Sequence, residues 1–278
     1  MACGRPGADL LPDNQLVLIC LLTASINLIG TLAYAARIAG VRTGRIALSF
    51  SLFNLLVLVS RMSNSFLGPF LAKRIETRLA DGGGDALEQD FRLVIASASV
   101  SVLLGILLVP TGQRLFARAI GYFQRNRSTV RMLLHTATPA GISAIRESLA
   151  LPSSAHLDHL APPRSVGWQV LASNMVAQAL LTVGVLASLY AGYLNPDFRV
   201  TASQLSAVVN GLATILLFAF IDPQLSVMTD DVVEGRMSGA DFRQAIIWIS
   251  FSRLGGTLLA QAIFLPSAAA IAWVANYV

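Results

Sequence analysis

Charged residues are scarce in this chain, and cysteine, histidine and lysine are scarcer still. Asp, Glu, Lys and Arg make up 13% of the 278 residues, against roughly 25% in an average soluble domain. Lysine occurs once. The two cysteines, Cys3 and Cys20, are too few and too unfavourably placed to form a disulfide framework or a metal site. Composition therefore excludes an ordinary soluble domain and a cysteine-stabilised one.

Signatures of catalysis are also missing. None of the three histidines, His135, His156 and His159, stands at metal-ligand spacing from a carboxylate or a cysteine. The sequence contains no P-loop for ATP hydrolysis and no serine–histidine arrangement for nucleophilic attack. We therefore expect a protein that is not an enzyme and that uses no metal and no cofactor.

Long apolar sequence is what the chain has in abundance, with a mean hydropathy of +0.66. A helix needs about 20 apolar residues, at about 1.5 Å each, to cross the hydrocarbon core of a bilayer. Backbone groups cannot stay unsatisfied in lipid, so such stretches must be helices. We predict an all-α integral membrane protein with about six transmembrane helices, over residues 15–36, 46–71, 91–109, 166–194, 203–228 and 245–275.

Lys and Arg are distributed unevenly between the connections. Those after the first, third and fifth stretches hold 12 of them, and the remaining connections and ends hold six when Arg92, at the start of the third stretch, is counted with the connection before it. The positive-inside rule then places the first set in the cytoplasm and both termini outside. Attraction to an anionic membrane surface explains the net charge of +5, and no nucleic-acid partner is expected.

One long connection divides the chain in two. We predict a first transmembrane half over residues 1–112, a cytoplasmic connection over 113–165 and a second transmembrane half over 166–278. Within the connection, residues 114–123 place apolar side chains on one helical face and arginines on the other. Such a helix suits the membrane interface. Packing of its apolar face on the rest of the protein is the alternative.

The two halves share short motifs that are consistent with inverted repeats of three helices each. Many transporters are built from such repeats, with the substrate site near the middle of the membrane. Chance similarity between apolar segments is the alternative. The matching positions are Asn54 with Asn210, Pro69 with Pro223, and the Asp-Phe-Arg sequences at 90–92 and 241–243.

A turn rich in arginine and glycine joins the first two stretches. Arg37, Arg42 and Arg45 carry guanidinium groups that match a phosphate bidentately, and Gly40 and Gly44 allow close approach of the backbone to a ligand. The next helix begins here and points its free N–H groups into the turn. We interpret the turn as a pocket for phosphate or pyrophosphate. A loop that contacts lipid headgroups is the alternative.

Three charged residues, Arg61, Asp222 and Arg253, lie at membrane depth. A charge there costs roughly 3 kcal/mol on insertion scales, so it normally faces a cavity or a partner. We interpret these residues, with Asn64 near Arg61, as a polar translocation path. A structural ion pair of Asp222 with Arg253 or Arg61 is the alternative.

Prolines and acids mark the later parts of the second and fifth stretches. Pro69 and Pro223 are expected to break their helices and to expose backbone groups that must face protein or water. Asp230 and Asp231 follow at the end of the fifth stretch. They could cap the helix, gate against the arginine turn or bind a cation, and simple solvation is the alternative.

Several segments carry a family resemblance. They are Gly-Thr-Leu-Ala-Tyr at 30–34, Arg-Ile-Ala-Gly-Val-Arg-Thr-Gly-Arg-Ile-Ala at 37–47, Ser-Leu-Phe-Asn at 51–54 with Ser60-Arg61, and Asp222-Pro223 with Thr229-Asp230-Asp231. In these segments, and in length and number of helices, the chain resembles the Amj family of bacterial lipid II flippases. That family is an alternative to the larger MurJ flippases. We recognise no family sequence in the long connection, so nothing is carried over to it.

The resemblance implies a lipid flippase of the bacterial cytoplasmic membrane. Its substrate would be lipid II, the undecaprenyl-pyrophosphate-linked disaccharide-pentapeptide of peptidoglycan synthesis, moved from the inner to the outer leaflet. We expect Arg37, Arg42 and Arg45 to capture the pyrophosphate at the cytoplasmic face and Arg61 to receive it deeper in the membrane.

The remaining polar residues are expected to assist. Asn54 and Asn64 would meet polar atoms of the head group, and Asp222 would balance Arg61 or Arg253 and couple transport to a proton gradient. Lipid II and membrane lipids are the expected partners, with the oligomeric state left open. A transporter of another polyprenyl-phosphate lipid and a non-transporting scaffold for envelope synthesis are the alternatives.

Overall fold

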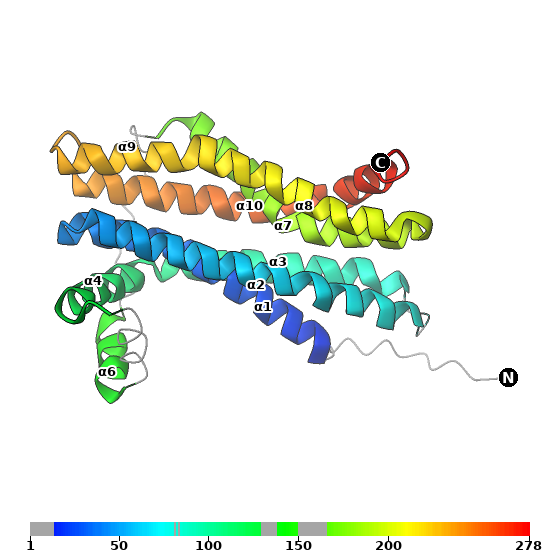
Figure 1. Cartoon of the computed structure of the whole chain (residues 1–278), viewed down its shortest axis with the longest axis horizontal. Coiled ribbons are helices and arrows are strands. Elements are labelled where there is room, and N and C mark those ends of the chain that lie inside the picture. Colours follow the sequence, from blue (N-terminus) through cyan, green and yellow to red (C-terminus); the bar gives the residue numbers. More distant parts are fainter. Residues whose placement is uncertain (1–13, 81, 83, 129–137, 150–165) are drawn as a thin grey trace.

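The chain folds into a bundle of long, roughly parallel helices (Figure 1). The computed structural model describes residues 14–80, 82, 84–128, 138–149 and 166–278, and these contain no strand. The three histidines, Cys3 and three of the prolines in the long connection lie outside the described residues. The helices are α1 (Asn14–Thr43), α2 (Ile46–Ala80), α3 (Leu87–Leu107), α4 (Val109–Asn126), α6 (Pro139–Ser148), α7 (Trp168–Leu194), α8 (Arg199–Leu216), α9 (Asp222–Val233) and α10 (Gly239–Val274).

Six helical spans are long and apolar enough to cross a membrane, which confirms the predicted number. In five of the six spans apolar residues are spread around the whole helix, as expected where lipid replaces water, whereas α8 in the fifth span has a more polar side. Five spans are single helices. The fifth, Pro196–Val233, is composite, because a π-helical segment, η4 (Leu217–Ile221), joins α8 to α9.

The two ends of the bundle differ. Helices α4 and α6 lie at one end, together with the α1–α2 turn and the α9–α10 turn, and we name it the α4 end (Figure 1). The opposite end, named the terminal end, holds the C-terminus and the start of α1. The three connections with the larger count of Lys and Arg therefore meet at the α4 end. The positive-inside rule predicts that this end faces the cytoplasm.

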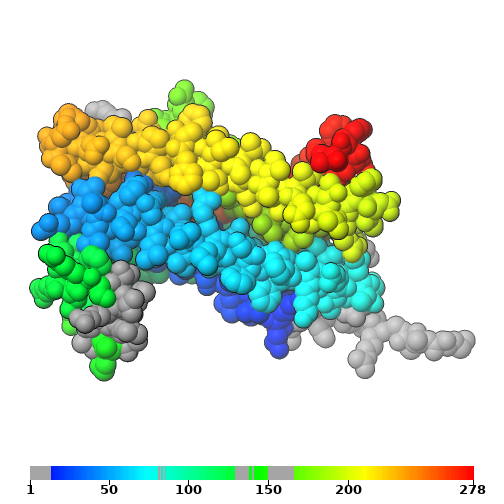
Figure 2. Space-filling view, in the orientation of Figure 1, coloured from blue at the N-terminus to red at the C-terminus, as the bar shows by residue number. Residues whose placement is uncertain are grey.

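The two halves of the chain pack in similar ways. Helix α1 packs on α2 and α3, and α7 packs on α8 and α10, while α3 and α10 form the main contact between the halves. Helix α2 and the fifth span are peripheral, with 17% and 11% of their most apolar windows buried, against 44% in α1 and α7. These two spans therefore present most of their surface to lipid. They meet along a seam between blue and yellow atoms in Figure 2.

The apolar core is divided into two clusters. The cluster at the terminal end is built around Phe91 and Phe264, whose rings stack with centroids 5.8 Å apart. The cluster at the α4 end is built around Phe242 and includes Phe53 and Leu225. Phe91 and Phe242 belong to the two Asp-Phe-Arg sequences, and each is fully buried in a different cluster.

A layer of polar side chains lies between the two clusters. Asn174 and Thr257 are fully buried there, and the amide of Asn174 donates to the Ile249 carbonyl at 3.0 Å and to the Ser252 hydroxyl at 2.6 Å. Polar groups in lipid are satisfied by such contacts between helices. The middle of the bundle therefore contains buried polar groups.

A buried ion pair closes the α2–α3 connection at the terminal end. Arg74 donates from Nε to the Asp90 carboxylate at 2.9 Å, and Arg78 donates to the same oxygen at 3.2 Å. Arg74 is 2% exposed and Asp90 is 8% exposed. Asp90 neutralises charge that would otherwise be buried alone, so it fixes the start of α3 against the end of α2.

One prediction about the helices needs correction. Pro69 does not break its helix, because α2 continues to Ala80. A proline removes one hydrogen bond, and a long transmembrane helix tolerates this loss. Pro223 does mark a change, since it opens α9 directly after the π-helical segment. The amphipathic stretch forms α4, and its apolar face packs on the α4-end cluster through Ile120 and Phe116, which is the contact that the alternative interpretation predicts. A position of α4 at the membrane interface stays a prediction.

Candidate functional site

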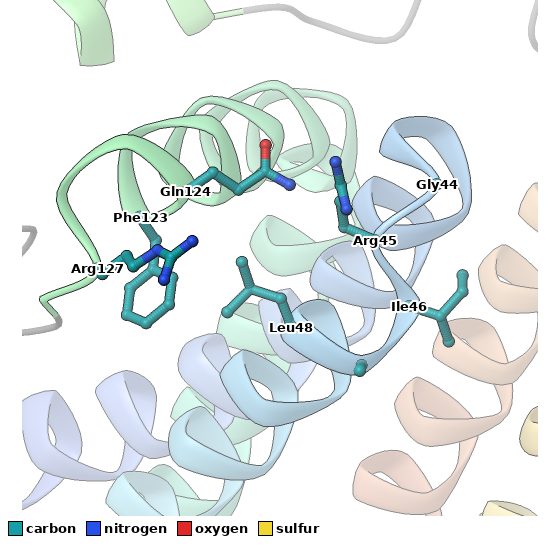
Figure 3. A pocket seen from close by; sticks show the side chains of 8 residues that line it. Gly44, Arg45, Ile46, Leu48, Phe123, Gln124 and Arg127 are labelled. Carbon is teal, nitrogen blue, oxygen red and sulfur yellow. The ribbon is translucent and has the colours of Figure 1, made fainter.

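A cavity of about 670 Å³ opens at the α4 end, between the α1–α2 turn and the end of α4 (Figure 3). Arg45 and Leu48 line one side, and Phe123, Gln124 and Arg127 line the other. Figure 3 shows the side chains of Arg45 and Gln124 reaching toward one another across the opening. Two guanidinium groups and one amide thus converge on a space of the size that small-molecule sites have, about 300 to 1,000 Å³.

Both walls of this cavity end in left-handed backbone. Gly44 has φ 67°, which ends α1 and lets the Arg45 amide donate to the Gly40 carbonyl at 3.0 Å. Arg127 has φ 46°, an unusual value for a residue other than glycine, and it ends α4. Helix α2 starts at Ile46, so its first amide groups also lie at the cavity.

The three predicted pyrophosphate ligands are separated by depth. Arg42 and Arg45 are exposed at the α4 end. Arg37 is only 4% exposed, and it lies about 9 Å inside the end of α1 at a rise of about 1.5 Å per residue. The turn therefore offers two surface arginines, and the third belongs to the interior.

Gly40 has a structural role that differs from the predicted one. The side chain of Ser49 on α2 occupies the place where a Cβ of Gly40 would stand. The glycine therefore lets α1 and α2 approach closely, and it does not face a ligand. A Cβ added to Gly44 would meet no atom within 4 Å, and the φ of 67° at Gly44 is what the turn requires.

The guanidinium of Arg37 is held by one carboxylate and two aromatic rings. Its Nη2 lies 3.5 Å from Oδ1 of Asp222, the first residue of α9. Its Cζ lies 4.2 Å from the ring centroid of Phe53 and 5.0 Å from that of Phe50. The expected pairing of Asp222 with Arg61 or Arg253 is therefore wrong, since Asp222 forms its ion pair with Arg37.

The reason is that Arg61 and Arg253 have other partners. Arg61 donates from Nη1 to the Thr214 hydroxyl of α8 at 2.9 Å, and its guanidinium lies 5.7 Å from the Phe218 ring centroid. Arg253 donates from Nη2 to Oδ1 of Asn27 at 3.2 Å. Both arginines thereby bridge the two halves of the chain.

Both arginines also lie deep in the bundle. Arg61 is about 22 Å from the start of α2 and Arg253 about 21 Å from the start of α10, at a rise of about 1.5 Å per residue. Tyr34 interacts electrostatically with both of them and with Arg37 and Asp222, so these five side chains form one cluster. The cluster holds three cations and one carboxylate. It therefore carries excess positive charge inside the membrane, where an anion is strongly favoured.

The remaining predicted residues lie at the edges of this arrangement. Asn54 is exposed on α2, and Asn64 is half-buried on the same helix. Asp230 is exposed on α9, and Asp231 accepts a hydrogen bond from Nε of Arg236 at 2.8 Å. Asp231 therefore closes the α9–α10 turn. Within the described parts of the chain, no group of three His, Cys, Asp or Glu side chains could hold a metal ion.

Four further residues belong to the site and were not singled out from the sequence. Arg127 and Gln124 form the second wall of the cavity, and Asn27 and Thr214 anchor the two deep arginines. Asparagine and threonine in apolar helices were a usable signal, because a polar residue in lipid needs a partner. Arg127 gave no such signal, since its position depends on the packing of α4.

Comparison with known proteins settles the family. The family profile described as "Amj: Alternate to MurJ" matches residues 22–275. The chain belongs to the Amj family. Lipid II flippase Amj of Bacillus subtilis (strain 168) is 38% identical over 270 residues, which is 95% of this chain and 98% of that protein. No solved structure matches this chain.

Membership of the Amj family extends over both halves of the chain. The matched residues include the arginine turn, Arg61, Asp222 and Arg253, and also the cavity residues of α4. The resemblance noted in the short segments is therefore confirmed over the length of the chain. The range matched by the family therefore includes both the cavity and the buried cationic cluster.

Proposed function

We propose that this chain is a lipid II flippase of the bacterial cytoplasmic membrane, moving lipid II from the inner to the outer leaflet. The relative that bears this name is similar over nearly its whole length. The observation that carries the proposal is a series of guanidinium groups at increasing depth from the α4 end. Arg45 lines the surface cavity, Arg37 lies deeper, and Arg61 and Arg253 lie in the central polar layer.

A pyrophosphate needs such a series because it cannot cross hydrocarbon unpaired. Arginine donors bind phosphate oxygens bidentately, so each guanidinium stabilises the anion at one depth. We place capture at the α4 end, by Arg45 in the cavity and by the exposed Arg42 on the same turn, with this end in the cytoplasm. Arg37 and then Arg61 receive the pyrophosphate, and Asn54 and Asn64 contact polar atoms of the head group.

The polyprenyl tail has a different path. Helix α2 and the fifth span are peripheral and meet along the seam of Figure 2. Arg61 and Thr214 form their hydrogen bond between these two spans. A head group between them could bind Arg61 while its tail stays in lipid. The proposed movement uses no ATP and no catalytic residue.

The test is translocation of fluorescent lipid II in proteoliposomes. We expect wild type to move the lipid and Arg61→Ala to slow it by at least about tenfold, since a charged hydrogen bond contributes roughly 1.5 to 3 kcal/mol. Arg125→Ala is the matched control, because Arg125 is exposed on α4 and does not line the cavity.

Two other results would redirect the proposal. Transport of a polyprenyl monophosphate in preference to lipid II would assign a different substrate to the same arginines. Absence of transport by folded wild-type protein, with and without a proton gradient, would favour a scaffold for envelope synthesis.

A further inference from the structure

The ion pair between Arg37 and Asp222 is loose for a buried contact. The nearest nitrogen and oxygen are 3.5 Å apart, whereas charge-assisted hydrogen bonds usually measure about 2.7 to 2.9 Å. Nε and Nη2 of Arg37 are buried and have no hydrogen-bond partner. A buried donor without a partner costs roughly 1 to 3 kcal/mol. The guanidinium is therefore held in place with unused donors.

The surroundings of Arg37 fix its position without using those donors. The rings of Phe53 and Phe50 face its Cζ at 4.2 Å and 5.0 Å, and aromatic faces attract a cation without accepting a conventional hydrogen bond. One carboxylate at 3.5 Å is the only anion that the described residues bring to it. A ligand with more oxygen atoms than a carboxylate could satisfy this guanidinium better.

Asp222 stands at the least regular point of its span. The π-helical segment Leu217–Ile221 ends directly before it, and Pro223, which has no N–H group, follows it. Such π-helical segments recur at functional sites. The carboxylate is 28% exposed, so it is more accessible than its partner. It also interacts electrostatically with Arg61, the next cation along the series.

From these observations we propose that Asp222 is an internal counter-ion that the pyrophosphate of the substrate displaces from Arg37. In the empty protein, Asp222 neutralises Arg37 and keeps the two halves of the chain together at this depth. When the pyrophosphate arrives, its oxygen atoms accept hydrogen bonds from Nε and Nη2 of Arg37, and the Asp222 carboxylate moves toward Arg61. The exchange breaks and forms no covalent bond. This role rests on the proposed function, and it identifies Asp222 as the residue that releases the substrate from Arg37.

The return of Asp222 to Arg37 would drive that release. A protein without the carboxylate should bind the pyrophosphate more tightly and pass it on more slowly. A residue that serves only packing predicts weaker binding together with slower transport, because loss of structure impairs both. The direction of the change in binding therefore separates the two roles.

The experiment measures binding and transport with Asp222→Asn, and Asp230→Asn is the control because Asp230 is exposed on the same helix. The binding probe is a polyprenyl pyrophosphate, titrated against the purified full-length protein in detergent. We expect about tenfold tighter binding for Asp222→Asn, the size of one charged hydrogen bond regained by the ligand. We also expect lipid II transport to fall by at least about fivefold.

Unchanged or weaker binding by folded Asp222→Asn protein would overturn the proposal. If that variant does not fold, Asp222→Glu provides a second test. Its longer carboxylate should reach Arg37 more closely and weaken pyrophosphate binding by about threefold, and equal or tighter binding would reject the counter-ion role. Failure of the proposed function looks different, since wild-type protein would then not move lipid II while the binding comparison still gives its answer.

Discussion

The guanidinium of Arg253 lies directly against Gly30 of α1. A Cβ added to Gly30 would stand 2.7 Å from Nη2, the nitrogen that donates to Asn27 at 3.2 Å. Gly30 is part of the first segment that resembles the Amj family. The absence of a side chain at this position therefore has a specific use, because it creates the space in which a buried cation lies.

Gly30→Ala is expected to displace the Arg253 guanidinium and to break its hydrogen bond to Asn27. Lipid II transport should fall by roughly tenfold, the equivalent of one charged hydrogen bond. Gly211→Ala is the control, since no atom lies within 4 Å of a Cβ at Gly211. Transport rates in proteoliposomes measure both variants, and equal rates would show that the placement of Arg253 does not matter.

Asp90→Asn is expected to lower the free energy of unfolding by about 3 kcal/mol, because it removes the carboxylate shared by Arg74 and Arg78 in a buried site. The matched control is Glu88→Gln. Glu88 pairs with Arg92 while both are about 40% exposed, and such a pair contributes less than about 1 kcal/mol. Unfolding titrations in detergent compare the two, and similar losses would contradict the burial argument.

Arg127→Glu is expected to weaken binding of a polyprenyl pyrophosphate by about fivefold at low salt, since it reverses a charge on the cavity wall. At about 1 M salt the Debye length is about 3 Å, so most of the effect should disappear. Arg125→Glu is the control, because it changes the net charge by the same amount at a residue outside the cavity. An equal loss for both variants would mean that overall charge, and not the cavity, attracts the lipid.

Gly40→Ala is expected to destabilise the contact between α1 and α2 by about 1 to 3 kcal/mol through overpacking against Ser49. Ser49→Gly in the same protein removes the atoms that the new methyl group would meet. The double variant should therefore recover most of the loss in melting temperature. If the double variant instead loses the sum of the two single losses in melting temperature, the contact between Gly40 and Ser49 is not the cause of the destabilisation.

The transmembrane spans could be predicted because the length of an apolar stretch and its lack of charge can be read directly from neighbouring residues. The composite nature of the fifth span could not be predicted, because residues Leu217–Ile221 are apolar like their neighbours and no feature of their sequence indicates a π-helix. The same limit applies to Pro69. A proline predicts a lost hydrogen bond, but whether the helix continues depends on the whole span.

The sequence reveals the arginine turn, but it does not show that Arg37 lies at a different depth from Arg42 and Arg45. Helix α1 continues to Thr43, seven residues beyond the end of the predicted apolar stretch. At 3.6 residues per turn, side chains five positions apart point about 140° away from each other. Arg37 therefore faces the bundle while Arg42 faces outward. The pairing of Arg37 with Asp222 joins residues far apart in the sequence, and no local pattern could reveal it.

The division of the apolar core into two clusters has a consequence for ion permeability. A polar layer that opened to both sides of the membrane at once would conduct protons and dissipate the gradients that a cell maintains. Each cluster seals this layer from one side, the one around Phe264 and the other around Phe242. If the chain moves a lipid head group as proposed, the head group can enter only when one of these clusters opens, and the ion gradients persist only while the other cluster stays closed.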